Sequence, residues 1–474
     1  MESLSLRLSD GVTLLVPRAL ESITTYVLLE QETWFEKELK FLHHYLKPGM
    51  TAIDIGANLG VYALPMAKLV GPTGRVFAYE PASEPRTLLQ RSGELNGAKN
   101  LEIVAAAVSD REGEAHLSFG ASSELNTLTG SAPGETVRIV NLDAEDATRG
   151  WAAPDFIKID AEGEEERILA GGKNFFVRHS PLVMLEIQAG ERVNEALRLE
   201  LPRMGYGLYR LLPDSPLLVP VAASDALDAY ELNLFAAKDD RAAALARAGW
   251  LVEGTAEWKP AANTDPLALL KAQPFASSFA LLFTDRMPRD RPYQDCLAAY
   301  SDWLSPAISP ARRWAALDFA FRTLRTLAPT PARLSTLARI ALESGNRAAG
   351  VEALASLIDT VRLGRVDFTE PFWPALPRYD AIAPGERIGD WFFAAAVEAL
   401  ERNRGHSSTF SGMTPFLEWL CRQPFASNEM ERRRTLVLAR AGQVPEVPPR
   451  LRVEAPDHLN AKIWNARKVP GTKT

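Results

Sequence analysis

Acidic residues stand at the ends of apolar, strand-like runs in the first half of the chain. Asp54 lies near the end of the first run and begins the segment Asp-Ile-Gly-Ala-Asn-Leu-Gly. Glu80 ends the second run, and Asp160 and Glu162 end a later one. In an open sheet of parallel strands, ligands bind outside the carboxyl ends of the strands. We therefore expect these carboxylates to meet at one binding edge.

The segment 54–60 predicts a strand, a tight glycine-bearing loop and a helix. A dinucleotide fingerprint would require G-x-G-x-x-G, but the loop reads D-x-G-x-N-x-G. Asp54 would repel a phosphate, so a cofactor with positive charge and no phosphate is favoured. S-adenosylmethionine carries an ammonium and a sulfonium. The alternative is a structural turn in which Asp54 caps the helix.

Glu80 lies in the triplet Tyr-Glu-Pro, 26 residues after Asp54. An acid at the end of the next strand, roughly 20 residues on, is placed to bind ribose hydroxyls. A third strand is predicted over 101–110 and a fourth over 156–163. The predicted cofactor-binding residues are Asp54, Gly56, Ala57, Asn58, Gly60, Glu80, Pro81 and Ala106.

Several motifs follow one another in a specific order and spacing. They are D-I-G-A-N-L-G, Y-E-P, A-A-V-S-D with a following E-G, K-I-D-A-E-G, and L-E-I at 185–187. This combination resembles the FkbM family of S-adenosylmethionine-dependent methyltransferases, over roughly residues 41–238. The resemblance implies an α/β fold with the Rossmann-like, doubly wound sheet of a class I methyltransferase. It also implies O-methylation of a hydroxyl on a sugar, glycan or secondary metabolite.

Lys158, Asp160 and Glu162 alternate with apolar residues, so a strand would place all three on one face. Buried charges need partners or a cleft, and we expect Asp160 beside the methyl group and the acceptor, as the base that takes the hydroxyl proton. The alternative is that Asp160 only neutralises Lys158. Carboxylates can also hold Mg²⁺, but spacing fixes no further acid, and no metal site is predicted.

Acceptor-side candidates come from two places. The interval 120–135 is rich in Ser, Gly, Thr and Asn and separates two predicted partner strands, 115–119 and 137–143. A polar loop of this length is more often functional than idle, and Ser122, Ser123 and Asn126 are its candidates. The alternative is a surface loop. Glu186 ends the strand predicted over 181–187 and is also expected to bind the acceptor.

The elements that position these residues divide into three parts. Residues 1–47 predict a hairpin about Asp10-Gly11 and a helix from Trp34 to Leu46, packed on the methyltransferase domain of residues 48–240. From 241 to 474 strand patterns disappear, and helical spacing predicts an all-α, helical-repeat-like domain. The segment 337–357 weakly resembles one helix pair of a tetratricopeptide-type repeat.

Composition excludes some classes of function. The net charge of −7 argues against nucleic acid as a partner. No apolar run predicts a membrane span, no signal peptide is apparent, and two cysteines fit a reducing compartment, so a cytoplasmic protein is expected. The expected partners are a small-molecule or glycan acceptor and, through the helical domain, a protein. The rival interpretation is a cofactor-binding scaffold in which the helical domain mediates assembly.

Overall fold

The computed structural model describes residues 2–118, 127–129, 134–189, 192–254, 256–260, 265, 267–283, 290–364, 366, 368–465 and 469–471. Its largest sheet has the strand order β15-β14-β16-β11-β10-β3-β4-β5. Along the chain, the bounds of these strands are β3 Thr51–Ile55, β4 Arg75–Tyr79, β5 Leu101–Val104, β10 Phe156–Ile159, β11 Leu182–Glu186, β14 Gly207–Leu211, β15 Leu218–Pro220 and β16 Asn233–Ala237.

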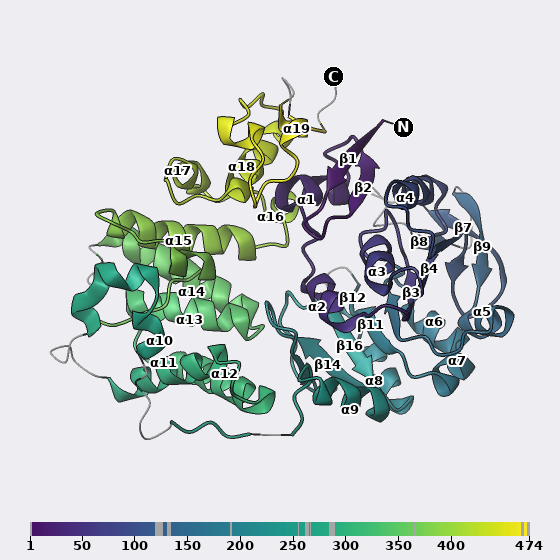
Figure 1. Cartoon of the computed structure of the whole chain (residues 1–474), viewed down its shortest axis with the longest axis horizontal. Coiled ribbons are helices and arrows are strands. Elements are labelled where there is room, and N and C mark those ends of the chain that lie inside the picture. The colour runs from purple at the N-terminus through teal and green to yellow at the C-terminus, as the bar shows by residue number, and fades with distance from the viewer. Residues whose placement is uncertain are drawn as a thin grey trace.

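The sheet is parallel from β5 to β11 and antiparallel from β11 to β15. The chain runs outward from β3 through β4 to β5 and later returns to β10 on the other side of β3. The strand order therefore reverses between β3 and β10, and such a switch point opens a crevice at the carboxyl ends of the strands. This confirms the predicted doubly wound methyltransferase sheet (Figure 1).

Helices cover both faces of the sheet because side chains alternate along each strand. Ile53 of β3 lies in a core with helices of one face, and Ala52 lies in a core with helices of the other. The first face holds α5 (Leu142–Arg149), α6 (Glu165–Gly171), α7 (Lys173–Arg178) and α8 (Glu195–Arg203). The second holds α2 (Lys37–Tyr45), α3 (Ala63–Val70) and α9 (Asp239–Arg247), with α4 (Ser83–Leu95) beside them.

The third predicted strand is divided between two sheets. Residues 101–104 form β5, whereas β6 (Ala107–Val108) belongs to a second sheet of order β6-β9-β7-β8. In that sheet β7 (Gly113–Ser118) pairs antiparallel with β9 (Glu135–Val140), as expected. A further strand, β8 (Thr127–Thr129), lies inside the interval predicted as a loop. The strands β12 (Gln188–Ala189) and β13 (Arg192–Val193) form a separate ribbon.

The N-terminal segment begins with the predicted hairpin of β1 (Ser3–Arg7) and β2 (Thr13–Pro17). A helix not predicted from the sequence, α1 (Ile23–Gln31), follows it and is almost wholly buried. Its apolar residues do not recur with helical spacing, because both of its sides are covered, and the periodic signal is therefore missing.

The segment after residue 240 begins in the first domain. Helix α9 packs on β16. At the edge of the sheet, the amide of Leu218 donates a hydrogen bond to the carbonyl of Trp250, and the amide of Val252 donates one to the carbonyl of Leu218. Sheet pairing therefore continues to residue 252, twelve residues beyond the expected boundary. The described residues that follow contain helices and no further named strand.

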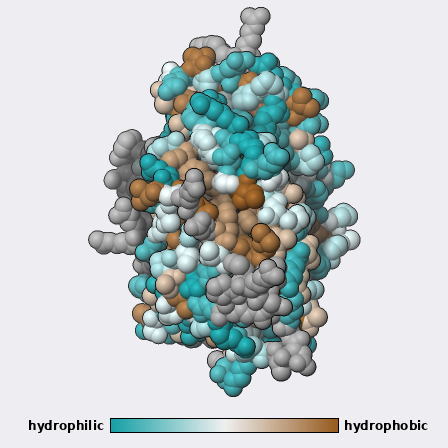
Figure 2. Space-filling view, turned by 90° about the vertical axis from the view of Figure 1, so that its left-hand side faces the viewer, coloured by the Kyte–Doolittle hydropathy of each residue, from teal (hydrophilic) through white to brown (hydrophobic). Residues whose placement is uncertain are grey.

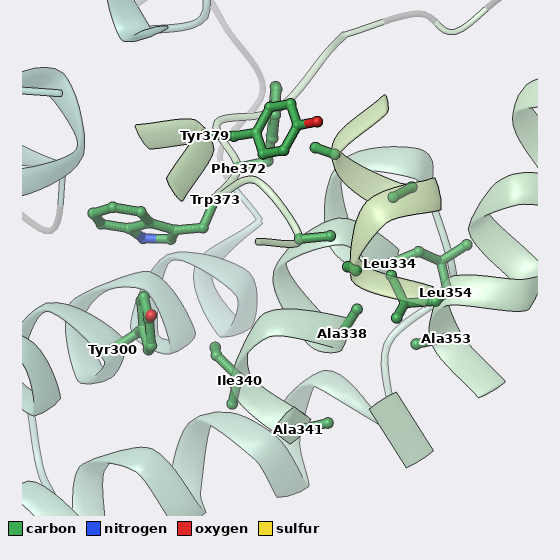
Figure 3. Close-up of a cluster of buried hydrophobic side chains, with 14 of the residues drawn as sticks. Tyr300, Leu334, Ala338, Ile340, Ala341, Ala353, Leu354, Phe372, Trp373 and Tyr379 are labelled. Carbon is green, nitrogen blue, oxygen red and sulfur yellow. The ribbon is translucent and has the colours of Figure 1, made fainter. Parts of the chain in front are cut away.

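The helical domain is built mainly from packed helix pairs, α11 with α12 and α13 with α14. Its core includes the ring pair of Tyr300 and Trp373, with centroids 5.3 Å apart, and aliphatic side chains of α13 and α14 (Figure 3). Figure 2 shows its outer side, where apolar side chains gather near the centre. The bounds are α10 Ala268–Lys271, η2 Pro274–Phe283, α11 Arg291–Leu304, α12 Pro310–Leu324, α13 Pro331–Glu343, α14 Arg347–Leu363, η3 Pro377–Ala381 and α15 Ile388–Asn403.

The last part of the chain returns to its beginning (Figure 1). It contains α16 (Ser408–Ser411), α17 (Leu417–Cys421), α18 (Asn428–Arg440), η4 (Pro449–Arg452) and α19 (Ala461–Trp464). Leu436 and Trp464 share a core with the hairpin. The buried guanidinium of Arg433 lies 2.9 Å from Glu30 of α1 and 3.3 Å from Glu401 of α15. This ion pair network joins α1, α15 and α18.

Among the described residues, no helix is both long enough and apolar enough to cross a membrane.

Candidate active site

A cavity of about 470 Å³ opens at the carboxyl ends of β3, β4 and β10. Eleven predicted site residues line it, and they come from loops that are distant in sequence. They are Asp54, Gly56, Ala57, Asn58, Glu80, Pro81, Ala106, Lys158, Asp160, Glu162 and Glu186. The convergence of these side chains follows from the parallel strands, whose carboxyl ends share one edge.

The loop after β3 holds a buried carboxylate against the cavity. Asp54 is fully buried, and neither of its carboxylate oxygens has a hydrogen-bond partner among the described residues. Burial raises the pKa of Asp54 to about 6, although the nearby Lys158 ammonium lowers it. This position therefore suits a cationic or hydrogen-bond-donating ligand group.

The two glycines of this loop are explained by packing. Gly56 has φ +81°, and a Cβ there would lie 1.7 Å from the carbonyl oxygen of Asp160. Gly60 has φ +91°, and its Cβ would meet the Leu89 side chain at 2.3 Å. Gly60 is not on the cavity wall. Gly56 lines the cavity and also makes room for the backbone carbonyl of Asp160, directly after β10, whereas Gly60 makes room for Leu89 of α4. Contact of either glycine with a cofactor stays a prediction.

Glu80 bridges two loops through its carboxylate. Its Oε2 accepts a hydrogen bond from the amide of Asn58 at 2.7 Å, and its Oε1 accepts one from Ala82 at 2.8 Å. Burial raises the pKa of Glu80 to about 7, and these two amides oppose the shift. An ionised carboxylate offers about four acceptor positions, so each oxygen can accept a further hydrogen bond from a ligand hydroxyl.

Lys158 links the acids of neighbouring strands. Its ammonium lies 2.7 Å from Oδ2 of Asp160 and 3.9 Å from Oδ1 of Asp54. Burial alone would lower the pKa of Lys158, but Asp160, Asp54 and Glu36 together raise it above its ordinary value. Lys158 therefore remains a cation inside the wall of the cavity.

Three carboxylates, including that of Asp160, lie close together in the cavity wall. The ligand atoms of Asp160, Glu162 and Glu186 all lie within 4.8 Å of one another. Burial and the two neighbouring acids raise the pKa of Glu186 to about 11, so it is protonated at neutral pH. Such a cluster can offer ligands to a hard divalent cation, but the Lys158 ammonium already compensates Asp160.

Glu162 adopts a backbone conformation that side-chain-bearing residues seldom occupy. Its φ is +50°, in the left-handed region, and Asn58 in the facing loop has φ +46°. For a residue without an Asn or Asp side chain, this conformation costs roughly 1 kcal/mol or more. The turn after β10 therefore holds Glu162 at the cavity in a strained conformation.

The segment between α1 and α2 also reaches the cavity. Trp34 and Phe35 both line it. Glu36 lines it too, and its carboxylate accepts hydrogen bonds from Tyr62 at 2.6 Å and Trp34 at 2.9 Å. Glu32, in the same segment, instead accepts hydrogen bonds from the backbone amides of residues 459 and 460.

The helical domain also reaches the cavity, which was not predicted. His406 and Phe410 belong to its wall. The rings of Phe35 and His406 have centroids 5.0 Å apart, and Phe410 is 53% exposed beside them. No local pattern marks these two positions, because the contact joins segments about 370 residues apart in sequence. The expected acceptor-side residues Ser122, Ser123 and Asn126 lie outside the described residues.

Comparisons with known proteins identify the domain that carries this cavity. Residues 54–208 match the family model described as the methyltransferase FkbM domain. A curated relative, the 31-O-demethyl-FK506 methyltransferase FkbM of Streptomyces tacrolimicus, is 29% identical over 202 residues, covering 35% of this chain and 75% of the relative. The resemblance noted in the sequence is confirmed.

Solved structures of methyltransferases were also found to be similar. A methyltransferase FkbM from Methylobacillus flagellatus KT is 17% identical, with a TM-score of 0.28, over 45% of this chain and 53% of that chain. This chain thus spans about half the length of that protein. A SAM-dependent methyltransferase from Aquifex aeolicus is 16% identical, with a TM-score of 0.25, over 44% of this chain and 90% of that one.

Proposed function

We propose that this chain, whose residues 54–208 match an FkbM-type methyltransferase domain, transfers a methyl group from S-adenosylmethionine to a hydroxyl oxygen. The observation that carries the proposal is the arrangement around one cavity of Asp54, Glu80 and Asp160, each at the end of a neighbouring parallel strand. The first two serve the cofactor and the third serves the acceptor. The acceptor class is a sugar, glycan or secondary metabolite.

The residues at the sheet's edge fit the chemistry of this cofactor. Asp54 supplies a buried negative charge without a hydrogen-bond partner among the described residues, which suits the methionine ammonium. Glu80 has acceptor positions left for the two ribose hydroxyls after binding its two backbone amides. Pro81 and Ala106 add apolar wall. The bound cofactor supplies an electrophilic methyl group on its sulfonium.

Asp160 is the residue proposed to receive the proton. Its side chain is 30% exposed in the cavity, and its Oδ2 is held by Lys158. The protonated Glu186 is a further hydrogen-bond partner of Asp160. An ionised carboxylate offers about four acceptor positions, so Asp160 can also accept a hydrogen bond from the acceptor hydroxyl. As the new oxygen–methyl bond forms, Asp160 takes the hydroxyl proton, while Glu162 and the protonated Glu186 border the acceptor.

Positioning supplies most of the rate in such a displacement, because an oriented pair of reactants can gain roughly 7–11 kcal/mol. The cavity wall fixes the acceptor from several elements at once. Phe35 and Tyr62 belong to this wall, and their rings help to exclude water.

Calorimetric titration with S-adenosylmethionine and with S-adenosylhomocysteine tests the cofactor assignment. Binding of both is expected, and a chain that binds neither at millimolar concentration refutes the enzyme. A methyl-transfer screen over glycans and hydroxylated metabolites then tests the acceptor class. The scaffold interpretation requires binding without transfer to any acceptor, in the wild type and in Asp160→Asn alike.

A further inference from the structure

A second cavity, of about 320 Å³, lies between the methyltransferase domain and the helical domain. Both domains line it: Lys37 and Tyr230 come from the first, and Arg339 and Arg347 from the second. It shares five lining residues with the first cavity, so the two are neighbours separated by one partition. The shared residues are Trp34, Phe35, Glu36, Leu232 and His406.

Most cations of this second cavity are already neutralised by carboxylates. Lys37 lies 2.6 Å from Glu231, and Lys40 lies 2.8 Å from Asp214. Arg339 pairs with carboxylates of α13 and η3, and Arg402 pairs with carboxylates of α15 and α18. A ligand anion would have to displace these partners to bind there.

Arg347, the first residue of α14, differs from them. Among the residues that the structure describes, no carboxylate oxygen lies within 4 Å of its guanidinium. Its Nε donates to the carbonyl of Asn403 at 2.9 Å, its Nη1 donates to Nδ1 of His406 at 3.1 Å, and the Tyr230 ring lies 4.5 Å away. Burial lowers the pKa of Arg347 to about 10, and the group is still a cation at neutral pH.

Its geometry leaves donors unused. A guanidinium carries five N–H groups in a planar fork, and the two hydrogen bonds above involve only Nε and Nη1. The nearby Asp228 carboxylate is engaged by the backbone amides of Ala348 and Tyr230. Within the part of the chain that the structure describes, Arg347 is thus a cation held by neutral groups in a cavity, with N–H groups that make no hydrogen bond.

His406 connects Arg347 to the methyl-transfer site. Because an arginine can only donate, Nδ1 of His406 must accept, and the ring proton of the neutral imidazole sits on Nε2. Burial and then the Arg347 charge lower the pKa of His406 to about 3, so the ring is neutral. The His406 ring lines both cavities and lies against Phe35.

We propose that Arg347 binds an oxyanion of the acceptor, a carboxylate or a phosphate ester, in the cavity between the domains. The acceptor then passes the partition at Phe35 and His406 and presents its hydroxyl to Asp160 in the first cavity. A guanidinium fork matches the two oxygens of such an anion. This inference rests on the proposed methyl transfer, and it gives the helical domain a role in choosing the acceptor.

Calorimetry on the full chain saturated with S-adenosylhomocysteine tests the inference. The probes are inorganic phosphate, D-glucuronate and, as the uncharged comparison, D-glucose. We expect the wild type to bind phosphate or glucuronate. Arg347→Gln should weaken that binding at least tenfold, because a charge-assisted pair is lost. Arg347→Lys, which keeps the charge, should weaken it less. Lys40→Gln is the matched control, because Lys40 lines the same cavity but is paired with Asp214.

The outcomes separate the two proposals. The inference is overturned if neither anion binds the wild type, or if Arg347→Gln binds them as the wild type does. The stronger of the two probes distinguishes a phosphorylated from a carboxylated acceptor. Failure of the wild type to bind S-adenosylhomocysteine would instead refute the proposed function. If Arg347→Gln does not fold, the ring ¹⁵N signals of His406 in the wild type, assigned with His406→Gln, must shift on addition of phosphate or of glucuronate; signals that both anions leave unchanged overturn the inference.

Discussion

The ammonium of Lys158 lies 2.7 Å from Oδ2 of Asp160, although the two side chains differ in exposure, at 4% and 30%. Lys158 also has Asp54 at 3.9 Å. A buried lysine that contacts a second acid does not depend on Asp160 alone for its charge. Asp160 is therefore available to act on a ligand while Lys158 fixes its orientation.

Replacing Asp160 by Asn separates its two interpretations. Loss of a general base lowers turnover by roughly 10²–10⁴, and affinity for S-adenosylhomocysteine should stay within a few-fold. Because Asp54 remains near Lys158, the melting temperature should change little. Single-turnover methyl transfer and thermal denaturation on one sample make the comparison. A loss of about 3–5 kcal/mol of stability, with normal turnover of the folded fraction, would show a structural role only.

Glu80→Ala should weaken both cofactor binding and the fold. The change removes the contact proposed for ribose and leaves the amides of Asn58 and Ala82 without their acceptor. Each unsatisfied buried group costs about 1–3 kcal/mol. Glu80→Gln keeps one acceptor oxygen for one of these two amides but sets an NH₂ donor opposite the other, so it should be milder than Glu80→Ala and still weaken both properties. Calorimetry with S-adenosylhomocysteine and urea unfolding give the two values, and unchanged affinity in Glu80→Ala removes Glu80 from the cofactor site.

Glu186→Gln should stabilise the protein increasingly as pH rises. The pKa of Glu186 is raised from 4.5 to about 11 in the folded chain. Between these values the folded state keeps a proton that the unfolded state releases, so this group's contribution to the unfolding free energy is full below pH 4.5 and is lost as pH rises. Gln imitates the protonated form without the titration. The difference in unfolding free energy between Glu186→Gln and the wild type should grow by at most about 1.4 kcal/mol per pH unit.

Urea unfolding at pH 5, 7 and 9 measures that difference. Glu253→Gln, at an exposed position, is the control and should show no such trend. A Glu186→Gln difference that is constant across the three pH values would mean that Glu186 titrates normally.

Gly56→Ala should be more damaging than Gly163→Ala, although both glycines have positive φ. A Cβ at Gly163 meets nothing within 4 Å, whereas one at Gly56 would lie 1.7 Å from the Asp160 carbonyl. Gly163→Ala should lose roughly 1–2 kcal/mol for its left-handed backbone alone, and Gly56→Ala should lose more, because the backbone at Asp160 must also move. Equal losses, measured by chemical unfolding, would contradict the packing explanation of Gly56.

Arg433→Ala should cost about 3–5 kcal/mol, because it leaves Glu30 and Glu401 buried without their partner. Lys40→Ala breaks the exposed pair with Asp214 and should cost at most about 1 kcal/mol. Thermal or urea unfolding compares the two. A mild Arg433→Ala would show that the network joining α1, α15 and α18 does not hold these helices together.

The sequence predicts most of the sheet and the site because these depend on local signals. Asp54, Glu80 and Asp160 each follow an apolar strand, and parallel strands bring such ends together. The division of residues 101–108 between two sheets could not be predicted, since the apolar run continues through Ala105 and Ala106 without a break. Packing, rather than local preference, decides where that strand changes sheet.

The parts that sequence analysis missed depend on contacts between distant segments. Phe35 and His406 meet only after the helical domain has docked, and neither has a neighbour in sequence that marks a site. Helix α1 gives no periodic signal because it is covered from both sides. The packing role of Gly56 could not be predicted, since a positive φ is predictable from a loop motif but the atom that would clash with a side chain is not.

The pairing of Glu30 with Arg433, 403 residues apart, has a consequence for protein synthesis. At a translation rate of 5–20 residues per second, roughly 20–80 s pass between the appearance of the two residues. During that time Glu30 has no Arg433 to pair with, on a face of α1 that must later be buried. The methyltransferase sheet can form early, but the wall of its cavity is completed only when His406 and Phe410 have left the ribosome.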